Sequence, residues 1–111
     1  MSISTHVLDT ARGGPAAGLA VTLSRRHAGA PWSVVGRAVT DAEGRVKEIS
    51  SVPLEAGEYR LDFAAGDYFK ASGTRAFYPE VSVVFAASQG DTHLHVPLLL
   101  SPFGYSTYRG T

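Results

Sequence analysis

Apolar residues in this chain recur mostly at every second position, in short runs that Gly- and Pro-rich turns separate. A period of two is typical of strands with one buried face, because successive side chains of a strand point to opposite sides. Leu19, Val21 and Leu23 show it clearly. The candidate strands are 3–8, 19–26, 32–39, 58–63 and 80–85, followed by two more in the tail that begins at His93.

The segments between these runs are rich in turn formers. We expect a loop over 12–18 and a tight turn over 40–46, in which Gly44 adopts a positive φ and Asp41 caps backbone amides. A short helix is expected between Gly66 and Gly73. Seven to eight short strands with one short helix predict an all-β fold, a two-sheet β-sandwich.

The length, charge and composition of the chain narrow the class of protein to which it can belong. A length of 111 residues predicts one domain over 1–111. Ten basic and ten acidic residues cancel and no basic stripe appears, so neither nucleic acid nor an anionic membrane is an expected partner. No signal peptide and no apolar run of the ~20 residues that a membrane helix needs is visible. The chain has no cysteine, which fits a reducing compartment, and we expect a cytoplasmic protein.

Two histidines lie two positions apart in the first tail strand, at His93 and His95. Both would point to one face of the sheet, while the opposite face, assigned to the core, would hold Leu94, Val96, Leu98 and Leu100.

This pair has two possible uses. Zinc would need a further ligand from His6 or His27, and no spacing supports either, so no metal is predicted. A neutral imidazole is a suitable general base near pH 7, which makes catalysis the better interpretation. The apolar Leu99, on the histidine face, indicates that another subunit covers this face.

The tail ends in Tyr108, Arg109, Gly110 and Thr111, which we expect to continue the second tail strand to the last residue. One interpretation is an ordinary edge strand, in which Tyr and Thr are present because they favour β-structure. A second interpretation is that Gly110 lets the chain approach a ligand, to which Arg109 offers a charge and Thr111 a hydroxyl. The residues alone do not decide between the two.

Four stretches in order along the chain resemble one family: 6–10 (HVLDT), 44–46 (GRV), 77–81 (FYPEV) and the whole tail from His93. They are similar to the 5-hydroxyisourate hydrolases, the transthyretin-like enzymes of urate breakdown. The tail is the specific part, because it resembles the Tyr-Arg-Gly-Ser ending by which the hydrolases differ from transthyretin, the thyroid-hormone carrier.

The resemblance implies a transthyretin-like sandwich that assembles as a homotetramer, a dimer of dimers, with active clefts between the dimers. It implies hydrolysis of a small purine-derived substrate, 5-hydroxyisourate, to 2-oxo-4-hydroxy-4-carboxy-5-ureidoimidazoline, with no cofactor. The catalytic residues it implies are His6, Arg45 and His95, and the substrate-binding residues are Tyr108, Arg109, Gly110 and Thr111. Two departures from the family pattern are Thr111 in place of Ser and Leu94 in place of Tyr.

Two other functions remain open from the sequence. The segments 18–23, 40–44 and 57–61 also resemble the prealbumin-like modules of surface proteins and carboxypeptidase tails, whose role is mechanical or adhesive. A small-ligand carrier in the manner of transthyretin is the second alternative. Binding without turnover would favour the carrier, and neither binding nor turnover would favour the module.

Overall fold

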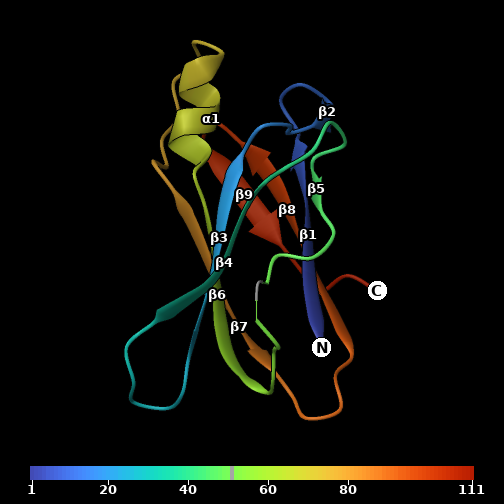
Figure 1. Cartoon of the computed structure of the whole chain (residues 1–111). Helices are drawn as coiled ribbons and strands as arrows, with labels where there is room; N and C mark the ends of the chain where they lie inside the picture. Colours follow the sequence, from blue (N-terminus) through green and yellow to red (C-terminus); the bar gives the residue numbers. More distant parts are fainter. Residues whose placement is uncertain (51) are drawn as a thin grey trace.

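The computed structural model describes residues 1–50 and 52–111, which form two sheets packed against each other with a short helix at one end (Figure 1). One sheet contains β1 (Ser2–Asp9), β2 (Gly14–Pro15), β5 (Arg45–Val46), β8 (His93–Ser101) and β9 (Gly104–Thr107). The other contains β3 (Ala20–Arg26), β4 (Ser33–Val39), β6 (Gly57–Phe63) and β7 (Val81–Ala87), and the helix is α1 (Ala65–Ala71). The predicted two-sheet sandwich with one short helix is confirmed.

The strand order places the two ends of the chain side by side. The first sheet has the order β2-β1-β8-β9, with β5 also paired to β1, and the second has the order β4-β3-β6-β7. β1 and β8 run parallel in a continuous register from the pair Ser2 and His93 to the pair Asp9 and Leu100. The other named pairs of strands are antiparallel.

Alternation along the strands separates a core face from an outer face. In β8 the predicted core set is buried, namely Leu94, Val96, Leu98 and Leu100. Ile3 and Val7 of β1 are fully buried in the same core, which they share with Tyr59, Leu61 and Phe63 of β6. Since Ile3 and Val7 face inward, the even-numbered residues Ser4 and His6 of β1 face outward, as do His93 and His95 of β8.

Three predicted boundaries are wrong. Residues Arg45–Val46 belong to the short strand β5 and not to a turn, and Gly14–Pro15 form β2 within the predicted loop. Both pair with β1, whose edge away from β8 would otherwise leave backbone groups without partners. The last strand ends at Thr107 and does not reach Thr111.

The helix also begins earlier than predicted, at Ala65, and so includes Gly66. Gly66 is required for a close approach and does not mark the helix start: a Cβ at this position would lie 2.7 Å from the carbonyl oxygen of Pro79. In the described part of the chain, no helix has the length and apolar character needed to cross a membrane.

Candidate active site

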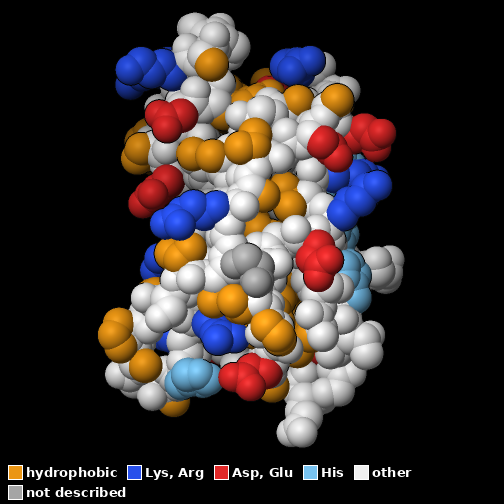
Figure 2. Space-filling model, in the orientation of Figure 1, with side chains coloured by type: hydrophobic (Ala, Val, Ile, Leu, Met, Phe, Trp, Pro, Cys, Tyr) orange, Lys and Arg blue, Asp and Glu red, His pale blue; other side chains and the backbone are white. Residues whose placement is uncertain are grey.

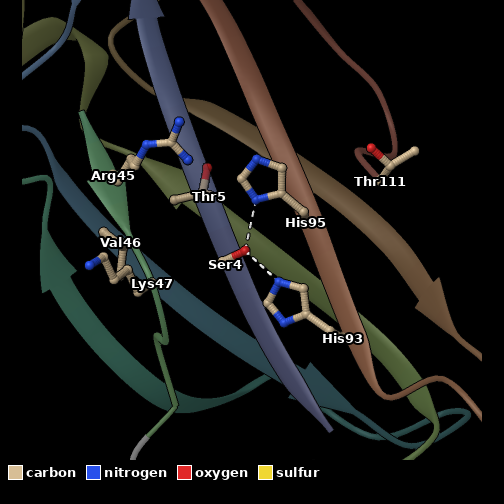
Figure 3. Close-up of a pocket in the computed structure, with 8 residues that line it drawn as sticks. All are labelled: Ser4, Thr5, Arg45, Val46, Lys47, His93, His95 and Thr111. Carbon is tan, nitrogen blue, oxygen red and sulfur yellow. Dashed lines mark hydrogen bonds between the residues drawn. The ribbon is translucent and has the colours of Figure 1, made fainter. Parts of the chain in front are cut away.

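A hollow of about 300 Å³ lies on the outer face of the first sheet, over β1, β5 and β8 (Figure 3). Figure 2 shows histidine and basic side chains together at the right-hand edge of the molecule, where β1 and β5 lie in Figure 1. The hollow is lined by Ser4, Thr5, Arg45, Val46, Lys47, His93, His95 and Thr111. The fold therefore brings predicted site residues from both halves of the sequence into one pocket.

His95 is the half-buried group at the centre of this pocket. Its Nδ1 lies 2.7 Å from the Ser4 hydroxyl, and its Nε2 has no hydrogen-bond partner among the described residues. Burial lowers the pKa of His95, and the positive charge of Arg45 lowers it further, with smaller contributions from His6 and His93. The chemical result is an imidazole that stays neutral near pH 7 and keeps one ring nitrogen free for a ligand.

Gly110 packs directly on the His95 ring. Its amide donates to the His95 carbonyl oxygen at 2.7 Å, which continues the register of the β8–β9 ladder after two unpaired residues. Residues opposite each other in such a ladder share a face, so a side chain at position 110 would meet the ring. A Cβ there would lie 2.5 Å from Cδ2 of His95. The glycine therefore leaves room for the imidazole, a local use that differs from the predicted approach to a ligand.

Arg45 is positioned by the tight turn that precedes it. One carboxylate oxygen of Asp41 accepts hydrogen bonds from the amides of Glu43 and Arg45, both at 2.9 Å. The bond from the Arg45 amide is the main cause of a lowered pKa of Asp41. Gly44 has a φ of 75°, and a Cβ there would lie 2.4 Å from the carbonyl oxygen of Val7. The predicted turn chemistry of Asp41 and Gly44 is confirmed, and it directs Arg45 toward His95 (Figure 3).

His6 lies beside this pocket but does not line it. It pairs with Arg45 across β1 and β5, and it lies next to Pro97 of β8. Its Nε2–H donates to the carbonyl oxygen of Glu43 at 2.9 Å, so that its ring is fixed against the turn before β5. The structure thus brings Arg45 and His95 together and places His6 one step further along the sheet.

The terminal tetrapeptide divides between two hollows. Thr111 lines the histidine pocket and Gly110 packs on its imidazole, whereas Tyr108 and Arg109 line a second hollow of about 210 Å³ next to β7, to which His95 also contributes. Arg109 also forms an ion pair with Asp91 at 3.3 Å. In the single chain these two side chains do not reach the pocket, and their assignment to substrate binding stays a prediction.

Four residues that line the pocket were not predicted as site residues, namely Ser4, Thr5, Val46 and Lys47. Lys47 adds a second cation at the pocket, and Ser4 contacts both histidines of β8. The signal for Ser4 was its place two residues before His6 in a predicted strand, although its neighbours in space depend on a pairing that the sequence does not reveal. Across residues 1–50 and 52–111, no group of three or more His, Cys, Asp or Glu side chains could hold a metal ion.

Comparison with known proteins identifies the class to which this fold and pocket belong. The model of the HIUase/Transthyretin family matches residues 3–110, and the chain belongs to that family. A 5-hydroxyisourate hydrolase of Caulobacter vibrioides is 49% identical over 113 residues, which cover 98% of this chain and 97% of the relative.

Solved structures of both branches of the family share the fold. The 5-hydroxyisourate hydrolase of Klebsiella pneumoniae has a TM-score of 0.87 at 39% identity, with 100% of both chains covered. Sea bream transthyretin in complex with thyroxine has a TM-score of 0.91 at 33% identity, covering 100% of this chain and 96% of the transthyretin. Since hydrolase and carrier share one backbone, the fold alone does not separate the two functions.

The titration of His95 gives a first prediction. Burial and the Arg45 charge disfavour the imidazolium, so NMR should show the pKa of His95 below the ordinary value of about 6.5. Arg45→Gln should raise that pKa, whereas Lys70→Gln on α1 should leave it unchanged. The native state binds a proton at His95 less readily than the unfolded state does. The contribution of His95 to the free energy of unfolding is therefore fully present above pH ~6.5 and is lost as the pH falls. An unchanged pKa in Arg45→Gln would contradict the assigned cause.

The contact of Gly110 with the imidazole gives a second prediction. Gly110→Ala should push the tail away from His95, since forcing a methyl group into packed space costs about 1–3 kcal/mol. The amide at position 110 should then exchange its hydrogen at least about tenfold faster, and the ring signals of His95 should shift. Gly104→Ala is the matched control, because a Cβ there meets only the Ser101 hydroxyl at 3.7 Å. Equal exchange and unshifted ring signals in both variants would refute the packing role.

Proposed function

We propose that this chain hydrolyses 5-hydroxyisourate to 2-oxo-4-hydroxy-4-carboxy-5-ureidoimidazoline in urate breakdown, the reaction for which its hydrolase relatives are named. The observation that carries the proposal is the free Nε2 of a half-buried, neutral imidazole in a pocket shared with a guanidinium. A volume of about 300 Å³ suits a small planar heterocycle. No covalent nucleophile, metal or organic cofactor is required.

The reaction adds water to a cyclic acyl amide and opens the six-membered ring. In the proposed mechanism His95 accepts a proton at Nε2 from the attacking water, a form of general-base catalysis worth about 10²–10⁴-fold. It then returns this proton to the ring nitrogen that leaves as the acyl C–N bond breaks. Arg45 faces the same pocket and stabilises the oxyanion that forms at the carbonyl. Burial lowers the pKa of His95 and the charge of Arg45 lowers it further, so that the imidazole is neutral again before the next turnover.

We assign the base to His95 and a supporting role to His6. The Nε2–H of His6 donates to the Glu43 carbonyl oxygen, and the ring does not line the pocket. His95 lines it with Nε2 free of partners among the described residues. His6 then acts at the rim, through its proximity to Arg45, its partner across the sheet.

The tail supplies the substrate-binding residues of the proposal. Thr111 lines the pocket and keeps the hydroxyl that the family ending carries on Ser, so we expect turnover to survive this departure. Gly110 holds the tail against His95. Tyr108 and Arg109 belong to the substrate-binding set through the family resemblance, and more than half of the Tyr108 surface is exposed in the single chain.

A homotetramer, a dimer of dimers, is part of the same proposal, with the cytoplasm as its location. Leu8 and Leu99 are paired neighbours on the outer face, on the same side of the sheet as His6 and His95. Two half-exposed leucines beside a polar pocket favour burial against a second subunit. Such a subunit would cover the pocket and exclude bulk water, leaving the attacking water molecule beside His95.

The activity itself is tested with substrate made freshly from urate by a urate oxidase, by following its ultraviolet decay. The wild type should accelerate decay, His95→Asn should reduce kcat/KM by about 10²–10⁴-fold, and Arg45→Gln by about 10²–10³-fold. His27→Asn, which changes an exposed histidine outside the pocket, should match the wild type. Decay at the spontaneous rate with folded wild-type protein would rule out the hydrolase and return attention to the carrier and the module.

The assembly is tested by a charge placed on the apolar part of the outer face. Leu99→Glu should lower the molar mass found by light scattering from that of a tetramer, because a carboxylate is costly to bury between subunits. Val39→Glu is the control, since Val39 is exposed on β4 of the other sheet. A tetramer unchanged by Leu99→Glu would refute this interface.

A further inference from the structure

Four side chains form a row on the outer face, from Ser2 through His93 and Ser4 to His95, and the last three of them line the pocket. The proposed mechanism uses only His95. His93 Nδ1 lies 2.5 Å from the Ser2 hydroxyl, and His93 Nε2 lies 3.0 Å from the Ser4 hydroxyl. The Ser4 hydroxyl is also 2.7 Å from Nδ1 of His95 (Figure 3). The parallel register explains the row, because it pairs Ser2 with His93 and Ser4 with His95.

The number of hydrogens available restricts how this row can bond. The Ser4 hydroxyl carries one hydrogen and touches two imidazole nitrogens, so it can donate to only one of them. If it donates to His93, then Nδ1–H of His95 donates to Ser4, and Nε2 of His95 keeps a lone pair. If it donates to His95, the neutral ring carries its hydrogen on Nε2 and cannot act as a base there.

The charge distribution around His95 favours the first arrangement. His95 presents the side of its ring away from Ser4 toward Arg45 (Figure 3). A lone pair on Nε2 is attracted to that cation, whereas an N–H bond there would place a positive hydrogen against it. Lys47, which also lines the pocket, adds to the positive field.

Ser4 has no competing structural task for its hydroxyl. It is 7% exposed, and its only side-chain partners among the described residues are the two histidines. The neighbouring Thr5 differs, because its hydroxyl donates to the backbone carbonyl of Val96 inside the sandwich. A small buried hydroxyl that touches only two imidazoles is suited to setting their protonation pattern.

We propose that Ser4 is a positioning residue that holds His95 in the tautomer with hydrogen on Nδ1 and a free Nε2, and that His93 supports it by accepting the Ser4 hydrogen. The role in turnover rests on the proposed hydrolase function, while the tautomer is a property of the unliganded protein. Ser4 contacts no substrate in this scheme and acts through His95.

The matched variants are Ser4→Thr and Ser4→Val, which have the same shape and differ only in the hydroxyl. Both β-branched residues are favoured in strands, so both variants should fold. The first measurement is nitrogen-15 NMR of histidine-labelled protein at pH 8, without substrate. The wild type and Ser4→Thr should show hydrogen on Nδ1 of His95, and Ser4→Val should show a shift toward hydrogen on Nε2.

The second measurement is turnover of fresh 5-hydroxyisourate. Ser4→Val should lower kcat by about ten- to a hundredfold with little change in KM, because loss of a supporting partner misdirects a reacting group without removing it. Ser4→Thr should recover most of the rate. His93→Leu cannot accept the Ser4 hydrogen, and its kcat should lie between those of Ser4→Val and Ser4→Thr. His93→Gln should restore activity, because its amide oxygen can accept that hydrogen.

The two measurements separate the possible failures. Equal tautomers and equal rates in Ser4→Thr and Ser4→Val would overturn the positioning role while leaving the hydrolase intact. Wild-type protein with no turnover would overturn the proposed function, and the NMR comparison would still decide the tautomer. A wild-type His95 with hydrogen on Nε2 would overturn the positioning role whatever the rates.

Discussion

The parallel pairing of β1 with β8 is the constraint on which the rest of this structure depends. It joins the two ends of the chain in one continuous register from the pair Ser2 and His93 to the pair Asp9 and Leu100. Alternation then points Ile3 and Val7 of β1 and the core leucines of β8 inward, and it points Ser4, His93 and His95 outward. The core and the candidate site therefore both depend on this pairing. A shift of its register by one residue would turn the core side chains outward and the site side chains inward.

Two further elements complete the pocket because they also attach to this pair of strands. The short strand β5 adds Arg45 on the free side of β1, and the tail returns along β8 to place Gly110 on the His95 ring. Hydrolase and transthyretin relatives share this backbone. What favours an enzyme over a carrier is therefore the local chemistry, a neutral imidazole facing a cation, rather than the sandwich.

The sequence predicted the fold because alternation in β8 and the turn at Asp41 and Gly44 depend on neighbours in the chain. It did not predict β5, since residues 45–46 form a strand only by pairing with β1, a contact distant in sequence. The role of Ser4 was invisible for the same reason: its partners lie about 90 residues away, a separation set by the register. The resemblance supplied His6 and Arg45, which local patterns alone would have left as surface residues, and it selected His95 from the histidine pair that the spacing had already indicated.

The proposed function requires that the substrate binds on the outer face over β1 and β8. A crystal structure of the chain with a planar, slowly reacting oxopurine analogue tests it most directly. We expect the analogue in the histidine pocket, with an oxygen facing Arg45 and Nε2 of His95 within hydrogen-bond distance of the ring or of a bridging water. An analogue bound instead in the hollow beside β7, against Tyr108 and Arg109 and away from Arg45 and Nε2 of His95, would contradict this prediction.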